Sequence, residues 1–407
     1  MILFGHPTGN PNSHHAALAH FETGRLAAFC VPWMPSEPAL ELLGFLPPLR
    51  ALAERLKRRH FAPLVRAPKI QGRLGEFRRL ALRARGHETE GLAYEANDWL
   101  MRTMARACIR KEVSAVHAYE DCSLSQFLAA KRLGKPCLYD MPIGYYPAWA
   151  ATQAKLSREF PDWLPAGGLP SNRWVRPEQK QREMELADLV LAPSSFVRDS
   201  ILQFHPEKKV VLAPYGVDLE FWHPLAAGST TANPPPSGQP LRFIFAGQCS
   251  LRKGTPVLLE AWARAAIPDA HLELVGSWQM APARLKELPA NVSYTAPVAR
   301  RQLRDHYRAA DVFLFPSYFE GFALVVLEAM ACGLPIVATE ATPDILDESC
   351  TRIIPSGNVE ALVETLRWFD RNRHRLPGMK QAARAKAETC TWANYRRCVS
   401  EAVRPFV

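Results

Sequence analysis

Several signatures that would place this chain in a familiar class are absent. No run approaches the roughly 18 consecutive apolar residues that a transmembrane helix needs. The nine cysteines form no C-x-x-C pair and no cluster with histidine at zinc-ligand spacing. The G-x-G-x-x-G fingerprint of dinucleotide-binding loops is also missing. An integral membrane protein, a zinc protein and an ordinary dinucleotide-binding loop are therefore not expected.

The start of the chain shows no secretory signal peptide. Residues 1–5 have the pattern of a short β-strand, and the charged segment and apolar segment of a signal are missing. Scattered cysteines in an odd number are typical of reduced thiols in protein cores. We therefore expect a cytoplasmic protein.

The chain is strongly basic. Its 407 residues carry a formal net charge of +10, and 48% of them are hydrophobic. This length favours two domains, and the apolar content is sufficient for a core in each. The positive charge suits an anionic partner, which could be a phosphorylated small molecule, an anionic lipid surface or a nucleic acid.

Short β-rich apolar runs alternate with amphipathic helical stretches. This alternation predicts βαβ units with parallel sheets, and hence an α/β fold. The expected strands of the first half are residues 1–5, 27–32, 113–118, 136–140, 188–193 and 210–214, and those of the second half are residues 241–246, 271–276, 292–296, 311–316 and 335–339.

A change of composition divides the chain. Residues 223–240 are rich in Pro, Gly, Ser and Thr, so we expect an exposed linker there. The sequence thus predicts a first domain at residues 1–222, a second at residues 241–385 and a final helix within residues 386–407.

The two halves share a short sequence motif. Residues 187–194 read ADLVLAPS, and residues 310–317 read ADVFLFPS. Each predicts a helix end, an aspartate, a buried strand and a Pro-Ser stop. The echo favours two similar α/β units that face each other.

The segment 315–339 (FPSYFEGFALVVLEAMACGLPIVAT) carries the most chemistry. A buried strand leads into a loop, and a helix then runs to about Cys332, with Gly333 in the usual position of a helix-terminating glycine. The unpaired amides at a helix N-terminus attract phosphate groups. The predicted donor-binding residues of the loop and helix start are Glu320, Gly321, Phe322, Ala323 and Leu324.

Two glutamates of this segment have candidate roles. Glu328 lies in an otherwise apolar helix, where a carboxylate needs partners such as the two hydroxyls of a ribose. Glu320 precedes the helix and could hold hydroxyls of a transferred sugar, so it is also a catalytic candidate. The alternatives are that Glu320 only favours the helix dipole and that Glu328 is simply exposed.

A second loop could hold phosphates. Residues 245–254 (FAGQCSLRKG) predict a strand, a loop that contains Gly247, and a helix start. Arg252 and Lys253 lie where phosphates would meet the helix N-terminus, and their charges would neutralise a diphosphate leaving group. An ordinary basic helix start is the alternative.

The run from Glu320 to Pro335 (EGFALVVLEAMACGLP) closely resembles the signature of glycosyltransferase family 4, in which two glutamates flank seven residues. Residues 180–224 are similar to the end of the family's first domain, although Tyr215 stands in Pro-Tyr-Gly-Val-Asp where the family usually has Pro-Asn-Gly-Val-Asp. Residues 245–254 match as well, except that Gln248 replaces the arginine that commonly follows the glycine.

The resemblance implies a GT-B fold, in which two Rossmann-like domains face each other across a cleft that holds the active site. It also implies retention of anomeric configuration without a metal or other cofactor, and the absence of an Asp-x-Asp motif agrees. Arg252, Lys253 and helix amides would then replace the charge of a metal. The favoured family mechanism is front-face substitution, in which the leaving phosphate helps to deprotonate the acceptor.

The first half would supply the acceptor side. In the family its first loop approaches donor phosphate or acceptor, and Gly9 and Asn10 are our candidates. A turn followed by a helix cap at Asn12 or Ser13 is a compatible alternative. Residues 113–118 match the family strand that ends in a histidine, here His117, which could equally be a core residue.

Asp140 departs from the family pattern. It occupies the place where the next strand usually ends in a second histidine near the reacting carbon. A carboxylate there could accept the acceptor proton or support an oxocarbenium-like centre. It could equally cap the turn before Pro142.

Residues 50–85 are strongly basic. They could dock peripherally on the inner face of an anionic membrane, as transferases with lipid-linked acceptors do, or form a solvated face of surface helices. Nucleic acid is a less favoured partner because aromatic residues are not interleaved. The cations are Arg50, Arg55, Lys57, Arg58, Arg59, Arg66, Lys69, Arg73, Arg78, Arg79, Arg83 and Arg85.

We therefore predict a retaining, metal-independent hexosyltransferase that moves a sugar from a UDP- or GDP-sugar to a glycan, a lipid-linked or a small-molecule acceptor. A nucleotide-sugar epimerase or a sugar phosphorylase on the same scaffold is one alternative. A non-catalytic nucleotide- or glycan-binding protein is another, and the departures at Gln248 and Asp140 keep it open.

Overall fold

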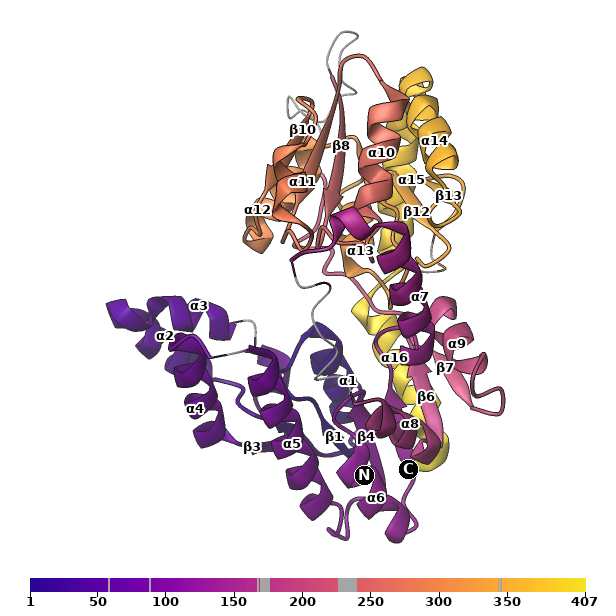
Figure 1. Cartoon of the computed structure of the whole chain (residues 1–407). Coiled ribbons are helices and arrows are strands. Elements are labelled where there is room, and N and C mark those ends of the chain that lie inside the picture. The colour runs from indigo at the N-terminus through magenta and orange to yellow at the C-terminus, as the bar shows by residue number, and fades with distance from the viewer. Residues whose placement is uncertain are drawn as a thin grey trace.

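The computed structural model describes residues 1–57, 59–87, 89–166, 168, 176–225, 240–342, 344 and 346–407. The chain forms two α/β units, which Figure 1 shows as a lower body for the first half and an upper body for the second. Residues 226–239, most of the predicted linker, lie outside the described residues.

The first unit is built on a parallel sheet with the strand order β3-β2-β1-β4-β5-β6-β7. The strands are β1 (Ile2–Gly5), β2 (Leu26–Val31), β3 (Lys69–Gln71), β4 (Ala115–Tyr119), β5 (Cys137–Asp140), β6 (Leu189–Ala192) and β7 (Val210–Leu212). Its helices are α1 (Pro11–Glu22), α2 (Glu37–Phe45), α3 (Arg50–Lys57), α4 (Arg73–Ala84), α5 (Thr89–Ala107), α6 (Leu124–Arg132), α7 (Tyr146–Glu159), α8 (Pro177–Leu186) and α9 (Ser195–Leu202).

The second unit repeats this plan with the order β10-β9-β8-β11-β12-β13, again all parallel. Its strands are β8 (Leu241–Ala246), β9 (Ala270–Val275), β10 (Val292–Thr295), β11 (Val312–Phe315), β12 (Ile336–Thr339) and β13 (Thr351–Ile354). Its helices are α10 (Thr255–Ala265), α11 (Pro282–Lys286), α12 (Arg300–Ala309), α13 (Leu324–Ala331), α14 (Val359–Arg371), α15 (Leu376–Glu388) and α16 (Trp392–Val403).

Both sheets have the Rossmann order. Counted from the first strand of each unit, the described strands run 3-2-1-4-5-6 in both sheets, with β7 added at the edge of the first. In this topology ligands bind beyond the carboxyl ends of the strands. The predicted α/β class and two Rossmann-like domains are confirmed.

Two edge strands escaped the sequence analysis. β3 has only three residues, all of them partly exposed, and it pairs only with β2. β13 pairs only with β12, and its Ile353 is largely exposed. β3 reads Lys-Ile-Gln and β13 begins with Thr-Arg, so neither shows the apolar run that identified the other strands.

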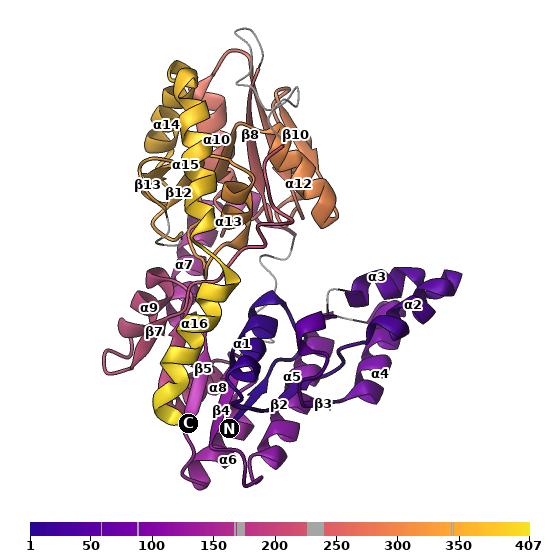
Figure 2. The same cartoon turned by 180° about the vertical axis from the view of Figure 1, so that it is seen from behind.

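Segments of each half reach the other unit. The last helix, α16, returns to the first unit and packs on α1, as Figure 2 shows from behind. Trp392 stacks on His15 with ring centroids 4.3 Å apart, and Arg396 forms an ion pair with Glu22 at 2.9 Å. In the other direction, the Trp163 carbonyl after α7 accepts a hydrogen bond from the Ala281 amide at 2.9 Å.

Helices α2, α3 and α4 form an arm that projects from the side of the first unit (Figure 1). A small separate apolar cluster of Trp33, Leu40 and Leu56 holds it together. Within the described residues, no helix is both long enough and apolar enough to cross a bilayer. All nine cysteines are free thiols, and seven of them are buried.

Candidate active site

The loop between β11 and α13 lies where the two units meet. Gly321 packs against the first unit so closely that a Cβ atom would collide with the Pro142 carbonyl. The Gly144 amide donates a hydrogen bond to the Glu320 carbonyl at 3.1 Å, and the Ser194 hydroxyl donates one to the Gly321 carbonyl at 2.6 Å. Glycine at this position therefore permits the contact that joins the predicted donor loop to the first unit.

Three side chains converge on the Glu320 carboxylate, which is 4% exposed. Lys253 Nζ contacts it directly, the Ser317 hydroxyl donates to it at 2.6 Å, and an Arg252 nitrogen lies 3.5 Å from it. Arg252 also donates to the Phe319 carbonyl at 2.8 Å. The two predicted phosphate ligands and the predicted sugar ligand thus form one cluster, with Ser317 as a member that the sequence analysis missed.

Burial governs the charge of this cluster. It lowers the pKa of Lys253 to about 8, although Glu320 acts in the opposite direction. Lys253 therefore remains largely protonated at neutral pH. Ala323, the N-cap of α13, has a positive φ of 53°, and Leu324 begins the helix, so its first amides point into the same region.

Glu328 lies one turn into α13, on a different side from this cluster. Its surroundings raise its pKa to about 7, chiefly through burial, with Arg300 opposing and Asp218 adding to the rise. Within the described residues its carboxylate accepts no hydrogen bond. It is half-buried rather than simply exposed.

The other predicted donor-side residues lie at the carboxyl end of β8. Gly247 follows this strand directly and has a φ of 148°. Gln248, which replaces the family's arginine, is exposed. Among the described residues, no three His, Cys, Asp or Glu side chains are placed to hold a metal ion.

The loop after β1 folds around the buried His6. The Gly9 amide donates to His6 Nδ1 at 2.9 Å. Asn10 is the N-cap of α1. Its side-chain oxygen accepts a hydrogen bond from the Ser13 amide at 2.8 Å, and the Ser13 hydroxyl accepts one from the Asn10 amide. The expected cap at Asn12 or Ser13 was therefore wrong, because Pro11 takes the first helical position and moves the cap to the residue before it.

Asp140 and His117 come together inside the first unit. His117 Nε2 lies 3.7 Å from Asp140 Oδ2, and His117 Nδ1 is 2.9 Å from His20 Nε2. Burial raises the pKa of Asp140 to about 7, against a smaller opposing effect of the Tyr119 hydroxyl. Burial lowers the pKa of His117 to about 3. No hydrogen bond among the described residues joins the Asp140 carboxylate to the turn at Pro142, so the capping alternative is not what the structure shows.

Three tyrosines surround this pair, and the sequence analysis assigned none of them to the site. They are supplied by β4, by the loop after β7 and by α16. Six buried polar atoms of the region lack a hydrogen-bond partner among the described residues: Asn12 Oδ1, His117 Nε2, Asp140 Oδ2 and the hydroxyls of Tyr119, Tyr215 and Tyr395. Such groups are rare in proteins, and here they form a buried polar cluster around Asp140.

Tyr215 connects the two clusters. Its ring contacts the ring of Phe322, in the predicted donor loop, at a centroid distance of 5.3 Å. Tyr215 is also the residue that departs from the family's Pro-Asn-Gly-Val-Asp. That departure was the one signal in the sequence that pointed to any of the three tyrosines.

Two family models match the chain, one on each unit. A model described as Glycosyltransferase Family 4 matches residues 49–221, and one described as Glycosyl transferases group 1 matches residues 240–371. The D-inositol 3-phosphate glycosyltransferase of Xylanimonas cellulosilytica is 37% identical over 147 residues, which are 32% of this chain and 34% of that protein. The alpha-maltose-1-phosphate synthase of Mycolicibacterium smegmatis is 28% identical over 207 residues, which are 46% of this chain and 52% of that protein. The chain thus matches about a third to a half of the length of these relatives.

Solved structures share the whole fold. The sucrose-phosphate synthase of Thermosynechococcus elongatus superposes with a TM-score of 0.64 at 17% identity, over 99% of this chain and 98% of that one. The HepE protein of Anabaena, in complex with UDP and glucose, does so with a TM-score of 0.58 at 16% identity, over 99% of both chains. The two family models, which together match residues 49–221 and 240–371, show that the chain belongs to glycosyltransferase family 4, and the superpositions show that it has the GT-B fold.

Proposed function

We propose that this protein is a retaining glycosyltransferase that takes a sugar from a UDP- or GDP-sugar and transfers it to a hydroxyl of a glycan, a lipid-linked or a small-molecule acceptor. The observation that carries the proposal is the convergence of Arg252 and Lys253 on Glu320 at the start of α13. Cations and free helix amides at one point suit a diphosphate, and an adjacent carboxylate suits sugar hydroxyls. The names of the relatives and the UDP and glucose in HepE support a nucleotide-sugar donor.

In this proposal each donor-side residue has one task. Arg252, Lys253 and the first amides of α13 bind the diphosphate and stabilise the charge that develops on it. Glu328 accepts hydrogen bonds from the two hydroxyls of the ribose. Its carboxylate is suited to this role because it is half-buried and accepts no hydrogen bond from the described residues. Glu320 exchanges part of its contact with Lys253 for hydroxyls of the transferred sugar.

The charge of Arg252 and Lys253 replaces that of a metal ion. The reaction is a front-face substitution: the bond from the anomeric carbon to the phosphate oxygen breaks, and the bond to the acceptor oxygen forms on the same face. The acceptor proton passes to the leaving phosphate oxygen. No protein nucleophile is needed.

Asp140 acts on the acceptor side. A carboxyl group with a pKa of about 7 is partly ionised at neutral pH. Its negative form would stabilise an oxocarbenium-like centre. His117, neutral at this pH, lies beside Asp140, with Nε2 3.7 Å from Oδ2.

The arm of α2, α3 and α4 would attach the protein to the inner face of an anionic membrane. Its surface combines exposed cations without an ion pair among the described residues, such as Arg73 and Arg83, with exposed apolar side chains. Phe45 is 82% exposed and Leu74 is 87% exposed. A basic surface with protruding apolar side chains is suited to the boundary between headgroups and acyl chains.

The test is a screen of UDP- and GDP-sugars for a rise in melting temperature, followed by turnover with a mixture of glycan and lipid-linked acceptors. We expect one donor to stabilise the protein, nucleoside diphosphate to be released only with an acceptor, and NMR of the product to show retained anomeric configuration. Activity should persist in EDTA. Turnover that EDTA abolishes and Mg²⁺ or Mn²⁺ restores would contradict the role given to Arg252 and Lys253, and release without any acceptor would favour an epimerase.

A further inference from the structure

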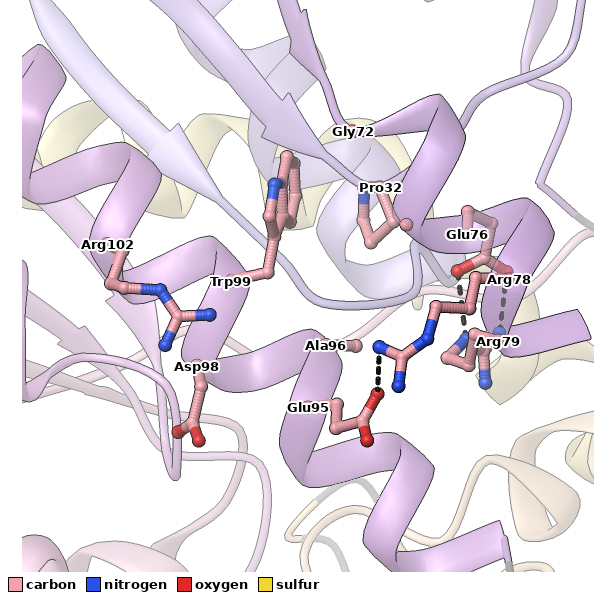
Figure 3. Close-up of a pocket in the computed structure, with 11 residues that line it drawn as sticks. Pro32, Gly72, Glu76, Arg78, Arg79, Glu95, Ala96, Asp98, Trp99 and Arg102 are labelled. Atoms are coloured by element: carbon pink, nitrogen blue, oxygen red, sulfur yellow. Dashed lines mark hydrogen bonds and ion pairs between the residues drawn. The ribbon is translucent and has the colours of Figure 1, made fainter. Parts of the chain in front are cut away.

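A second pocket lies in the first unit, between α4 and α5. It has a volume of about 350 Å³ and is shown in Figure 3. This volume is near the lower end of the range of about 300–1,000 Å³ that is usual for small-molecule sites. None of the residues discussed above as donor or catalytic groups lines it.

The pocket opens at the edge of the sheet where ligands bind. Pro32 and Gly72, which line it, directly follow β2 and β3. Both strands run parallel to β1, whose carboxyl end leads into the loop of Gly9 and Asn10. Adjacent strands are about 4.8 Å apart, so Pro32 and Gly72 lie roughly 5 and 10 Å to the side of the end of β1. The pocket can therefore hold a part of the acceptor that extends away from the reacting hydroxyl.

An indole ring forms one wall. Trp99 is half-buried, and Figure 3 shows it between Arg102 and Pro32. A Cβ atom at Gly72 would collide with the ring, so the missing side chain is what lets Trp99 pack against the backbone of residue 72. The ring is thereby held in one place and presents an apolar surface to the pocket.

Charged groups of both signs form the rest of the lining. The Glu95 carboxylate lies 3.3 Å from Arg78, and the Asp98 carboxylate lies 2.8 Å from Arg176. Arg102 is exposed and forms no ion pair among the described residues. These groups offer a guanidinium donor and carboxylate acceptors around the indole, while the pairing leaves little net charge.

We propose that this pocket binds a neutral pyranose ring, the sugar of the acceptor next to the transfer position. A pyranose has an apolar C–H face that matches an indole ring and a rim of hydroxyls that donate to carboxylates and accept from guanidinium groups. The proposal rests on the proposed function only in assigning that sugar to the acceptor.

Position and charge both favour this ligand. A nucleotide or sugar phosphate would meet the carboxylates of Glu95 and Asp98 beside the indole, and a lipid chain would meet charged groups on most sides. The outer face of α4 carries the exposed Leu74 and Phe77 of the membrane arm. A lipid-linked sugar at the membrane surface would thus be presented to the pocket on the same helix.

The test measures binding of methyl α- and β-hexopyranosides to the full chain by saturation-transfer NMR, without any nucleotide. We expect at least one glycoside to bind in the millimolar range and sorbitol, which has hydroxyls but no ring face, not to bind. Trp99→Ala should weaken binding at least tenfold. Trp368→Ala is the matched control, since Trp368 is also half-buried but lies on α14 of the other unit; it should leave binding unchanged.

Arg102→Gln provides a second variant in case Trp99→Ala does not fold, because Arg102 is exposed and its loss cannot disturb the core. We expect it to weaken glycoside binding several-fold. The proposal is overturned if no glycoside binds to the wild-type protein at tens of millimolar, if sorbitol binds equally well, or if both variants bind like the wild type. A melting-temperature screen with UDP and GDP, run in parallel, tests the donor site separately, so failure of the pocket and failure of the transferase proposal give different results.

Discussion

The clusters around Glu320 and around Asp140 differ in how their polar side chains are bonded. Around Glu320, the charged groups are bonded to one another, through Lys253, Arg252 and Ser317. Around Asp140, buried polar atoms lie near one another but lack hydrogen-bond partners. The first cluster is therefore joined by short polar contacts, whereas the second is held together by packing and burial.

The strands that lead to the two clusters are nevertheless built alike. In the similar segments 187–194 and 310–317, Asp188 and Asp311 each accept a hydrogen bond from a backbone amide of the neighbouring strand, at 2.8 and 3.0 Å. The closing serines, Ser194 and Ser317, contact adjacent residues of one loop, Gly321 and Glu320. The echo in the sequence therefore marks equivalent places in two units that meet at one loop.

The largest effect is expected from Lys253→Ala. The change leaves Glu320 buried with less compensation, and an unpaired buried charge destabilises a protein by about 3–5 kcal/mol. We expect lower stability in urea and a fall in turnover of about a hundredfold or more, as for loss of one group that stabilises transition-state charge. Lys253→Ala/Glu320→Gln should regain stability but not turnover.

Lys386→Ala is the matched control for this change, because Lys386 pairs with Asp347 at the surface. An exposed pair contributes about 0–1 kcal/mol, so little should change. If Lys253→Ala were as harmless as Lys386→Ala, the donor-side cluster would not have the role proposed for it above.

A smaller effect is expected from Glu328→Ala, which should weaken binding of the nucleoside diphosphate about tenfold or more, since hydrogen bonds to a charged group contribute about 1.5–3 kcal/mol. Calorimetry measures it. The pKa of Glu328 is about 7, so its carboxylate forms as the pH rises through 7, and wild-type affinity should rise between pH 6 and pH 8. Glu328→Ala should lack that rise. Unchanged affinity would remove the ribose role.

Asp140→Asn tests the acceptor side. We expect kcat to fall at least tenfold, about 1.4 kcal/mol, with donor affinity nearly unchanged, because the group acts in the transition state. His117→Ala, on the neighbouring strand, should lower kcat less. A loss of donor affinity as large as the loss of kcat would place Asp140 in the donor site instead.

Asp140→Asn should also change how the free energy of unfolding depends on pH. The pKa of Asp140 is raised from 3.8 to about 7, so the folded protein holds a proton that the unfolded chain has lost, and this contribution to stability disappears as the pH rises from about 4 to 7. Asp140→Asn should therefore be stabilised relative to the wild type more at pH 8 than at pH 5. Urea titrations at the two pH values measure the difference.

The smallest effect concerns the arm. Vesicles with anionic lipids should bind the protein and release it as salt increases, because exposed charges are screened over about 8 Å at physiological ionic strength. Arg73→Gln/Arg83→Gln should weaken binding, at about 1 kcal/mol for each cation near the surface, and Phe45→Ser/Leu74→Ser should also weaken it. Equal binding to neutral and anionic vesicles, or to neither, would leave only a solvated surface.

The sequence predicted what is local in the chain and missed what the fold brings together. Central strands such as β4 and β11 are buried on both faces, so their apolar runs were visible. The donor residues Glu320 and Glu328 share one segment, whereas the contact of Lys253 with Glu320 was not predicted from the sequence. Three kinds of feature left no local pattern: the edge strands β3 and β13, the cap that Pro11 shifts to Asn10, and a buried polar cluster whose tyrosines are at positions 119, 215 and 395.

The return of α16 to the first unit also sets the order in which the protein can be completed during synthesis. Domains generally fold from the N-terminus as the chain emerges from the ribosome. Here the surface of α1 that His15 and Glu22 occupy stays uncovered until residues 392–403 appear, after the whole second unit. Tyr395 likewise joins the polar cluster around Asp140 last. This cluster, although most of its residues are encoded in the first unit, is therefore completed only after the second unit has been synthesised.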